Sequence, residues 1–465
     1  MLTKRIALAV LLGGLLTLGT ATAGDKATAD AAIPAAKAAQ EAAAAVGTAR
    51  GLVVATGGGT LIDPANREAL AAGGDLVLLT TDPSELARRL AGMRGAAMKM
   101  GQMLSMESAD ILPREFTDAL AALRDSASRM PRSQVRGVLG REYGKGWEAR
   151  FEHFDFEPIA AASIGQVHRA TARDGRDLAL KIQYPGVAKS IDSDVDNMAM
   201  FMQMANILPV EVDISGIMTE VKRQLREEAD YQAEAKHLET YRRLIRDDPA
   251  FVVPRAHQDL TTRRILAMDY MTGDPIESLE GRGVTQAVRD RCGTKLQQLL
   301  FRELFEFRTM QTDPNFANYL YRSEDERVVL LDFGSTARFS KAFTQKYGKI
   351  SRALIAGDTG AIRHYAEEIG YLRPSDSAEH ADRILNIIRL VCEPITTPGV
   401  YDFGASDLVT RARDAGIEML FHSGGELKAP PPETVFLHRK LVGSFLACAR
   451  IRARVRVQDL IQRHL

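Results

Sequence analysis

Apolar residues in the main part of the chain form strand-like runs first and helical patterns afterwards. Residues 151–184 are strand-like, and Arg173-Asp174-Gly175-Arg176 between two of their apolar runs is a hairpin signal. Apolar positions then recur at helical spacing over 190–207 and 214–247. Four more short strand-like runs follow, at 252–253, 265–270, 319–321 and 328–331. This order predicts an α+β fold in which a small sheet-containing lobe precedes a larger helical lobe.

The N-terminal segment, residues 1–24, has the pattern of an export signal. Lys4 and Arg5 precede a short apolar run, and the small residues Ala21-Thr22-Ala23 come after it. The apolar stretch is at the lower edge of the length that crosses a bilayer. A cleaved signal and an uncleaved membrane anchor therefore both fit, and either would place the rest of the chain outside the cytosol.

Residues 25–92 are rich in alanine and glycine. Within them, an apolar run leads into the glycine triplet that ends at Gly59, and alternating helical and strand-like patterns come next. The stretch 51–90 resembles the middle of shikimate kinase, whose glycine triplet contacts the substrate. Because no G-x-x-x-x-G-K-[ST] loop precedes it, the phosphate cradle of such an enzyme is absent. We interpret the stretch as a non-catalytic remnant or fusion.

The composition excludes several classes of protein. Hydrophobic residues make up 45% and charged residues 26% of the 465 residues, which is typical of globular domains. Lys+Arg and Asp+Glu are balanced at 60 each, so the chain lacks the global basic field of a nucleic-acid-binding protein, and we expect no nucleic-acid partner. The three cysteines, Cys292, Cys392 and Cys448, lie far apart, which argues against a disulfide scaffold and favours a reducing compartment.

Two segments carry candidate phosphoryl-transfer chemistry. Asp313 and Asn318 are five residues apart in Gln311-Thr-Asp-Pro-Asn-Phe-Ala-Asn318, and Asp332 comes later in Asp332-Phe-Gly334. This is the spacing of the catalytic and metal-binding segments of protein kinases. Asn318 and Asp332 would offer hard oxygen ligands to Mg²⁺, and Asp313 would orient or deprotonate an acceptor hydroxyl. Each motif alone is more typical of a turn, but both at this separation favour the kinase interpretation.

Upstream residues extend the same pattern. Lys181 ends a strand-like run, as does the lysine that pairs with nucleotide phosphates in kinases, although a lone lysine there is more often solvated. Glu234 is its proposed partner, and the alternative is a solvated helix face. Ala160-Ala161-Ala162-Ser163 stands where a kinase has its glycine-rich loop. Alanine carries a Cβ atom, so this backbone approaches phosphate less freely than glycine does.

From about residue 93 to the C-terminus the chain resembles the UbiB (AarF-type) atypical kinases, in the branch of the coenzyme Q kinases. The resemblance rests on these motifs: Lys99-Met-Gly101-Gln102, Ala160-Ala-Ala162-Ser163, Leu178-Ala-Leu-Lys181, Glu228-Ala-Asp230, Glu234, Gln311-Thr-Asp313-Pro-Asn-Phe-Ala-Asn318 and Asp332-Phe-Gly334. It implies a bilobal, protein-kinase-like fold with a helical Lys-x-Gly-Gln extension at 93–145, an N-lobe at 146–271 and a C-lobe at 272–465.

The resemblance also implies a role for each motif. Lys99, Gly101 and Gln102 would cover the active site and face Glu228 and Asp230, which excludes peptide substrates. The catalytic set would be Asp313, Lys181 and Glu234, and the metal set Asn318 and Asp332. The nucleotide set would be Ala160, Ala161, Ala162, Ser163, Lys181 and Met268, with the alanine-rich loop favouring ADP over ATP.

The implied function is an atypical kinase or ATPase that uses ATP or ADP with Mg²⁺ and supports ubiquinone biosynthesis. Its expected substrate or cargo is a lipid or prenyl-quinone precursor at a membrane surface. A nucleotide-gated module that extracts such lipids without phosphoryl transfer is the alternative, followed by a protein Ser/Thr kinase. Partners among ubiquinone-biosynthesis proteins, and a homodimer, are compatible with the resemblance. Since ATP is a cytosolic metabolite, we expect membrane-associated catalytic lobes in the cytoplasm, in conflict with the export-like N-terminus.

Overall fold

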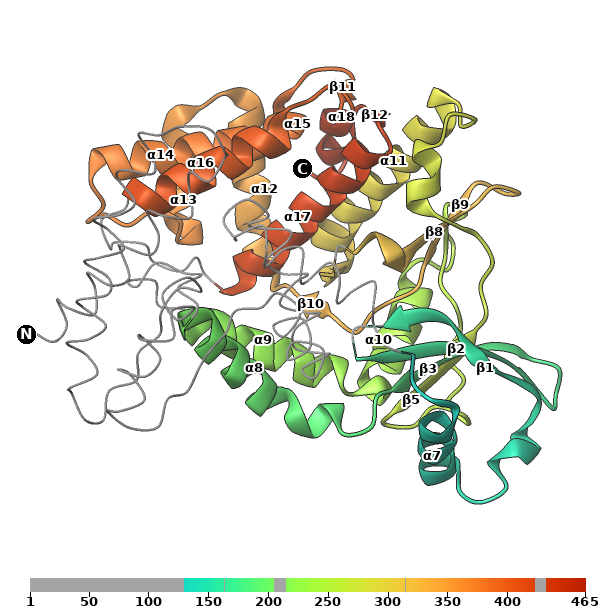
Figure 1. Cartoon of the computed structure of the whole chain (residues 1–465). Coiled ribbons are helices and arrows are strands. Elements are labelled where there is room, and N and C mark those ends of the chain that lie inside the picture. The colour runs from blue at the N-terminus through green and yellow to red at the C-terminus, as the bar shows by residue number, and fades with distance from the viewer. Residues whose placement is uncertain (1–128, 163, 205–214, 314, 423–431) are drawn as a thin grey trace, which may run out of the picture.

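The computed structural model of the chain describes residues 129–162, 164–204, 215–313, 315–422 and 432–465 (Figure 1). The signal-like segment, the shikimate-kinase-like stretch and the predicted helices before residue 128 lie outside these residues. So do Lys99, Gly101, Gln102 and Ser163.

A four-stranded antiparallel sheet with the strand order β1-β2-β3-β5 forms the first lobe. Its helices and strands are α7 (Arg132–Tyr143), η1 (Trp147–Arg150), β1 (Phe151–Ala162), β2 (Gly165–Ala172), β3 (Asp177–Gln183), α8 (Val187–Met204), α9 (Ser215–Glu228), α10 (Tyr231–Leu244) and β5 (Ile265–Asp269). The predicted hairpin turn at 173–176 joins β2 to β3, with Gly175 at the positive φ of 86° that favours glycine. Helices α8 and α9 lie side by side to the left of the first sheet in Figure 1 and are joined by ion pairs such as Lys222–Asp196.

The long helix predicted over 214–247 is wrong in one respect, because the structure divides it into α9 and α10. The chain leaves the helical conformation at Asp230, whose side chain accepts hydrogen bonds from the backbone N–H groups of Gln232 and Ala233, both at 3.1 Å. An aspartate in this arrangement caps the first turn of a helix and competes with continuation of the preceding one. Asp230 thereby sets the start of α10 and the position of Glu234 in its first turn.

The second lobe is mainly helical and contains a second, four-stranded sheet with the order β4-β9-β8-β6. The strands of this lobe are β4 (Phe251–Val252), β6 (Asp274–Pro275), β7 (Thr309–Gln311), β8 (Tyr319–Arg322), β9 (Arg327–Leu330), β10 (Thr336–Arg338), β11 (Tyr401–Asp402) and β12 (Arg454–Val455). Its helices are η2 (Ile276–Glu280), α11 (Gln286–Phe301), η3 (Arg302–Phe307), η4 (Phe316–Asn318), α12 (Lys341–Ala356), α13 (Thr359–Ile369), α14 (Ala378–Val391), α15 (Glu393–Thr396), α16 (Leu408–His422), α17 (Pro432–Arg450) and α18 (Val457–Gln462).

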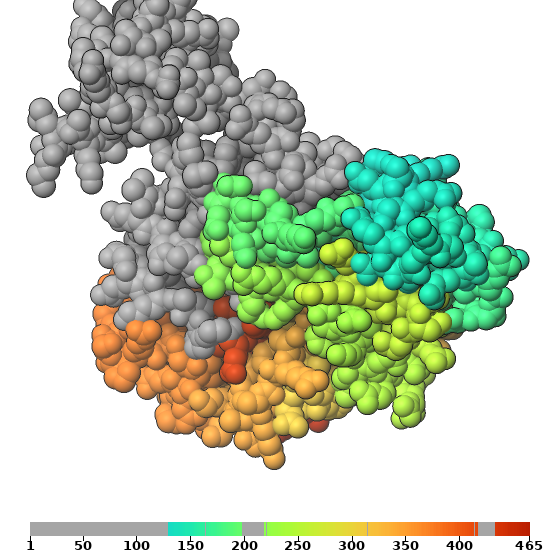
Figure 2. All heavy atoms as spheres, turned by 90° about the horizontal axis from the view of Figure 1, so that it is seen from below, coloured from blue at the N-terminus to red at the C-terminus, as the bar shows by residue number. Residues whose placement is uncertain are grey.

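The predicted α+β, two-lobed architecture is confirmed. Figure 2 shows the residues of β1 to β3 at one end of the molecule and the helices α12 to α14 at the other. Strand β4 pairs in parallel with β9, so the predicted lobe boundary at residue 271 separates β4 from the sheet that it joins.

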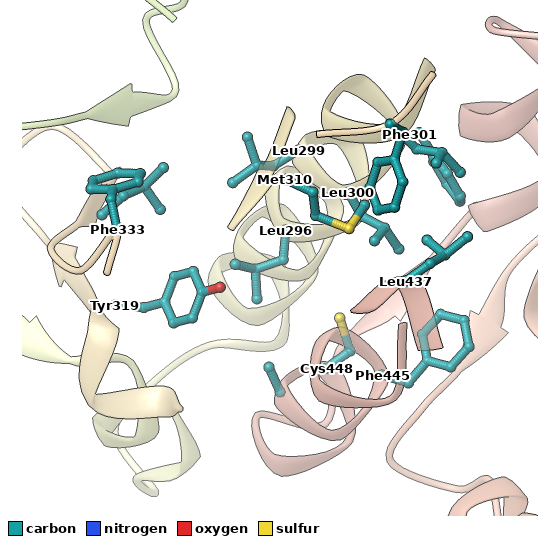
Figure 3. Close-up of a cluster of buried hydrophobic side chains, with 14 of the residues drawn as sticks. Leu296, Leu299, Leu300, Phe301, Met310, Tyr319, Phe333, Leu437, Phe445 and Cys448 are labelled. Carbon is teal, nitrogen blue, oxygen red and sulfur yellow. The ribbon is translucent and has the colours of Figure 1, made fainter. Parts of the chain in front are cut away.

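Two apolar cores stabilise these lobes. The smaller one lies between α7 and one face of the first sheet, and Trp147 and Phe151 belong to it. The larger one continues from α10 through the helical lobe. In its centre, leucine and phenylalanine side chains of α11 lie opposite Leu437, Phe445 and Cys448 of α17, with Tyr319 and Phe333 on one side (Figure 3). Tyr319 and Phe333 connect this core to the candidate site.

Candidate active site

Lys181 lies at the centre of the candidate site, and the alternation of β3 explains its orientation. Leu178, Leu180 and Ile182 are fully buried on the face of the sheet that α7 covers. Because successive side chains of a strand point to opposite faces, Ala179 and Lys181 point to the other face, toward α10. The Lys181 side chain is only 10% exposed there, so its ammonium group requires counter-charges.

Glu234 on α10 supplies the first of these counter-charges. Tyr231, Ala235 and Leu238 are fully buried on the face of α10 that packs against the core, and Glu234 shares this face with an exposure of 1%. The Lys181 Nζ atom donates to Glu234 Oε1 at 2.9 Å and to Oε2 at 3.1 Å. It also lies 5.2 Å from the centre of the Tyr231 ring. Glu234 is therefore a buried partner of Lys181 and not part of a solvated helix face.

Asp332 supplies the second counter-charge. It comes shortly after β9, and its Oδ2 atom accepts a hydrogen bond from Lys181 Nζ at 2.8 Å. Its Oδ1 atom accepts from the backbone N–H of Gly334 at 2.9 Å, which fixes the plane of the carboxylate. Phe333 between them is buried against the Tyr241 ring, with the two ring centres 4.5 Å apart. The Asp-Phe-Gly segment is thus anchored by its apolar side chain while its carboxylate faces Lys181.

The protonation of this cluster depends on burial and charge together. Burial alone would lower the pKa of Lys181, but the carboxylates of Asp332 and Glu234 outweigh it and raise this pKa well above its ordinary value. Burial raises the pKa of Glu234 to about 7, although Lys181 opposes this shift. Lys181 thus stays charged at physiological pH, and Glu234 is the group that gains a proton as the pH falls.

The loop that carries Asp313 is held by hydrogen bonds to its own backbone. The carbonyl oxygen of Asp313 accepts from Gln311 Nε2 at 2.5 Å and from Asn318 Nδ2 at 3.3 Å. Since the side-chain nitrogen Nδ2 of Asn318 is used in this way, the side-chain oxygen Oδ1 is the atom that remains to act as a metal ligand. The backbone N–H of Leu331 donates to the backbone carbonyl oxygen of Asn318 at 3.0 Å, which joins this loop to the strand that precedes Asp332.

A second link joins the Asp313 loop to the Asp-Phe-Gly segment. Strands β7 and β10 pair antiparallel, and the buried Thr312 hydroxyl lies 2.7 Å from that of Ser335. The backbone N–H of Thr312 also donates to the Ser335 carbonyl oxygen at 2.9 Å. These contacts hold Asp313 and Asp332 in one unit, as the kinase interpretation of the two motifs requires.

The alanine-rich loop forms the tip of the β1–β2 hairpin. Ala160, Ala161 and Ala162 pair with Val167, Gln166 and Gly165, and the first two are exposed. Gly165 meets β3 closely, since a Cβ atom on it would lie 2.2 Å from the carbonyl oxygen of Ile182. The hairpin therefore lies against the strand that carries Lys181.

Met268 lies on β5 beside the same strand. It pairs directly with Ala179, and directly paired residues point to the same face of a sheet, so Met268 shares the face of Lys181. Its side chain is 6% exposed and belongs to the larger core. It thus lies at the inner edge of the candidate nucleotide site.

The remaining predicted residues have different environments. Glu228 is buried at the end of α9, and its Cγ atom lies 3.5 Å from the position of a Cβ atom built on Gly334. It therefore lies beside the Asp-Phe-Gly segment. Asp230, predicted only as a partner of Lys99, is the N-cap of α10. The roles assigned to Lys99, Gly101 and Gln102 fall outside the described residues.

Sequence reasoning missed a buried polar cluster beneath the Asp313 loop. It consists of Glu303, Lys440, Tyr319 and the side chain of Gln311. Glu303 and Lys440 each stand among apolar residues at helical spacing, which is the signal that could have found them.

The fold and the site define a protein of the protein-kinase-like class, and comparisons with known proteins identify the family. The ABC1 atypical kinase-like domain matches residues 122–366, and the shikimate kinase family matches residues 36–122. The chain is 38% identical over 385 residues to the mitochondrial atypical kinase COQ8B of Rattus norvegicus, covering 83% of this chain and 72% of that protein. It is 34% identical over 388 residues to the mitochondrial atypical kinase COQ8 of Saccharomyces cerevisiae, covering 83% and 77%.

A solved structure shares the fold over most of its length. The complex of Rv3197 with erythromycin from Mycobacterium tuberculosis superposes with a TM-score of 0.57 at 26% identity, covering 82% of this chain and 95% of that one. The chain belongs to the ABC1 atypical kinase-like family, the UbiB family of the sequence-based expectation, which is thereby confirmed. It is an enzyme of the atypical kinase/ATPase class, of the type that supports ubiquinone biosynthesis.

Both COQ8 relatives are named as mitochondrial proteins. Among the described residues, every helix is too short or too polar to span a membrane.

Proposed function

We propose that the protein binds ATP or ADP together with Mg²⁺ through Lys181, Asn318 and Asp332. The observation that carries this proposal is the buried ion-pair cluster in which one ammonium group meets two carboxylates, Glu234 and Asp332, beside the Asp313 loop. Lys181, oriented by Glu234, is suited to contact nucleotide phosphates.

The donor set fits Mg²⁺ bound with a nucleotide. Asn318 offers the oxygen of its side-chain amide, and Asp332 offers a carboxylate, and both are hard oxygen ligands of the kind that Mg²⁺ prefers. Within the described part of the chain, His, Cys, Asp and Glu side chains form no group of three that could hold a metal without further ligands. A Mg²⁺ ion with few protein ligands is typical of sites where phosphate oxygens and water complete the coordination. Bound Mg²⁺ would neutralise charge on the transferred phosphoryl group.

We further propose that the acceptor or cargo is a lipid or prenyl-quinone precursor at a membrane surface. The similarity to the COQ8 kinases supports this substrate class. Asp313, 7% exposed and fixed through its backbone, would orient the acceptor hydroxyl or water. Ubiquinone-biosynthesis proteins and a second copy of the chain are the proposed partners, and the catalytic lobes are proposed to face the cytoplasm. Fractionation with protease accessibility tests this location.

The direct test is nucleotide binding and turnover by the full chain. Binding of fluorescent ATP and ADP analogues would be titrated with and without Mg²⁺. ATP turnover would then be measured with vesicles of anionic phospholipid, with and without a prenyl-phenol lipid. We expect Mg²⁺-dependent binding and turnover that the lipid increases. Nucleotide binding with the same affinity in the presence and absence of Mg²⁺ would contradict the proposed site. Strong phosphorylation of a peptide library would contradict the proposed substrate class.

The raised pKa of Glu234 predicts how the proposed activity depends on pH. Above pH 7 the Glu234 carboxylate is ionised and holds Lys181. Below its pKa of about 7 it gains a proton and the ion pair is lost, so we expect kcat/KM to fall by about tenfold per pH unit. Glu234→Gln should have lower activity and lack this inflection. The nucleotide phosphate titrates equally in both proteins, so an inflection that persists in the variant would belong to another group.

A further inference from the structure

A buried ion pair lies directly beneath the Asp313 loop and joins two distant parts of the helical lobe. Lys440 on α17 and Glu303 in η3 are 4% and 0% exposed, and Lys440 Nζ lies 3.0 Å from Glu303 Oε2. In Figure 1, α17 runs beside α11 and extends toward β10. The segment η3 that carries Glu303 is a π-helical continuation of α11, a feature often found at functional sites.

The Lys440 ammonium group is hydrogen-bonded to both ends of the Asp313 loop. It donates to Gln311 Oε1 at 3.2 Å and to the Tyr319 hydroxyl at 3.1 Å. The Tyr319 hydroxyl in turn donates to Gln311 Oε1 at 3.2 Å. Because Gln311 precedes Asp313 and Tyr319 follows Asn318, a single cation holds the residues on either side of the loop.

Glu303 completes the arrangement from the other side. Its Oε1 atom accepts from the backbone N–H of Gln311 at 3.2 Å and from the Tyr241 hydroxyl at 2.8 Å. Gln311 is thereby held at its side-chain oxygen by Lys440 and at its backbone N–H by Glu303. Its remaining group, the Nε2 amide, donates to the Asp313 carbonyl oxygen, which Asn318 also contacts.

The cluster also borders the metal-binding side chains. Glu303, Gln311, Lys440, Asn318 and Asp332 together line one small cavity, which has room for about one water molecule. Replacement of a buried ion pair by well-packed apolar residues is often neutral or stabilising, so these charges are weak evidence for a role in stability alone. Their hydrogen bonds are instead directed at the loop that carries the proposed catalytic groups.

We propose that Lys440 is a positioning residue that holds the Asp313–Asn318 loop through Gln311, with Glu303 as its counter-charge. Lys440 itself would contact neither nucleotide nor acceptor. This inference rests on the proposed function, since the loop it orders is the one that would orient the acceptor and bind Mg²⁺.

The test removes both charges together. Lys440→Met alone would leave Glu303 buried without a counter-charge, which is strongly destabilising and endangers folding. In the double variant Lys440→Met/Glu303→Gln, the glutamine keeps an acceptor for Tyr241 and for the Gln311 N–H. The matched control is Arg450→Met/Glu280→Gln, which removes an exposed ion pair (3.1 Å) made by the same helix α17.

Three quantities would be measured on the full chain: the Tm, kcat and KM for nucleotide, and hydrogen exchange of the backbone amides in 309–322. For the double variant we expect a Tm near that of the wild type, a nearly unchanged KM, and a kcat lower by about a hundredfold, the effect of a misplacement near 1 Å. Exchange in 309–322 should be faster, and the control should match the wild type throughout.

Each outcome is decisive. A double variant with normal kcat, or with unchanged exchange in 309–322, overturns the positioning role. A double variant with a lower Tm but with the kcat, KM and exchange of the wild type shows that the pair is structural only. A wild-type protein without turnover contradicts the proposed function instead. In that case the exchange measurement, which needs no nucleotide, still decides whether Lys440 holds the loop.

Discussion

Asp332→Asn is expected to lower Mg²⁺-dependent ATP turnover by about a thousandfold or more, because it replaces a charged metal ligand with a neutral amide. The folded structure should survive, since the asparagine carbonyl can still accept the Gly334 N–H that Asp332 Oδ1 now accepts. Turnover and the Mg²⁺ dependence of nucleotide binding would be measured in parallel, with Tm as the check on folding.

The matched control is Asp325→Asn, the same chemical change in the turn at the other end of β9. Asp325 pairs with Arg322 and Arg327 near the surface, so its loss should leave turnover unchanged. The variant Asp332→Asn also distinguishes the two candidate functions of this site, phosphoryl transfer and nucleotide-gated extraction of a lipid. If Asp332→Asn abolishes turnover while support of ubiquinone biosynthesis continues, nucleotide-gated extraction of a lipid replaces phosphoryl transfer as the function.

Gly165→Ala is expected to destabilise the first lobe by about 3 kcal/mol, the upper range for overpacking. The new Cβ atom would lie 2.2 Å from the Ile182 carbonyl oxygen and 2.9 Å from its carbonyl carbon. Both are backbone atoms, so no side-chain rotation relieves the clash, and the ladder between β2 and β3 must open. Urea-induced unfolding measures the loss. Nucleotide affinity should fall as well, because the alanine-rich hairpin moves away from Lys181.

Gly137→Ala in α7 provides the comparison. A Cβ atom at Gly137 has no neighbour within 4 Å, and alanine is favoured over glycine in a helix by about 1 kcal/mol. This variant should therefore be slightly more stable than the wild type. Equal effects of the two substitutions would mean that the close approach of Gly165 to β3 does not constrain the lobe.

Much of the candidate site could be predicted because its signals are local. The strand run ending at Lys181, the five-residue spacing of Asp313 and Asn318, and the apolar run before Asp332 each describe one segment. The structure brings Lys181, Glu234 and Asp332 into direct contact, as the kinase interpretation requires. Their roles in binding and catalysis stay proposals that the variants above test.

The sequence-based prediction of helices failed where the capping signal of a single residue competed with a longer helical pattern. The apolar residues over 214–247 keep a helical period across Asp230, so the pattern gave no sign that the helix breaks there. The break depends on the hydrogen bonds that the Asp230 side chain accepts from Gln232 and Ala233, and these form only in the folded structure. Met268 could be assigned to the site only from the resemblance, because its place beside Lys181 depends on the pairing of β3 with β5.

The sequence by itself determined the family, the two-lobed α+β architecture and the residues able to handle phosphate and metal, since these depend on short motifs and on the period of apolar side chains. The tertiary structure alone decided that Glu234 is buried, that Asp230 caps α10 and that Lys440 meets Glu303 beneath the Asp313 loop. A charge at an apolar position of a helix indicates burial. Its partner, however, is set by how segments far apart in the chain pack, and only the folded core brings them within hydrogen-bonding distance.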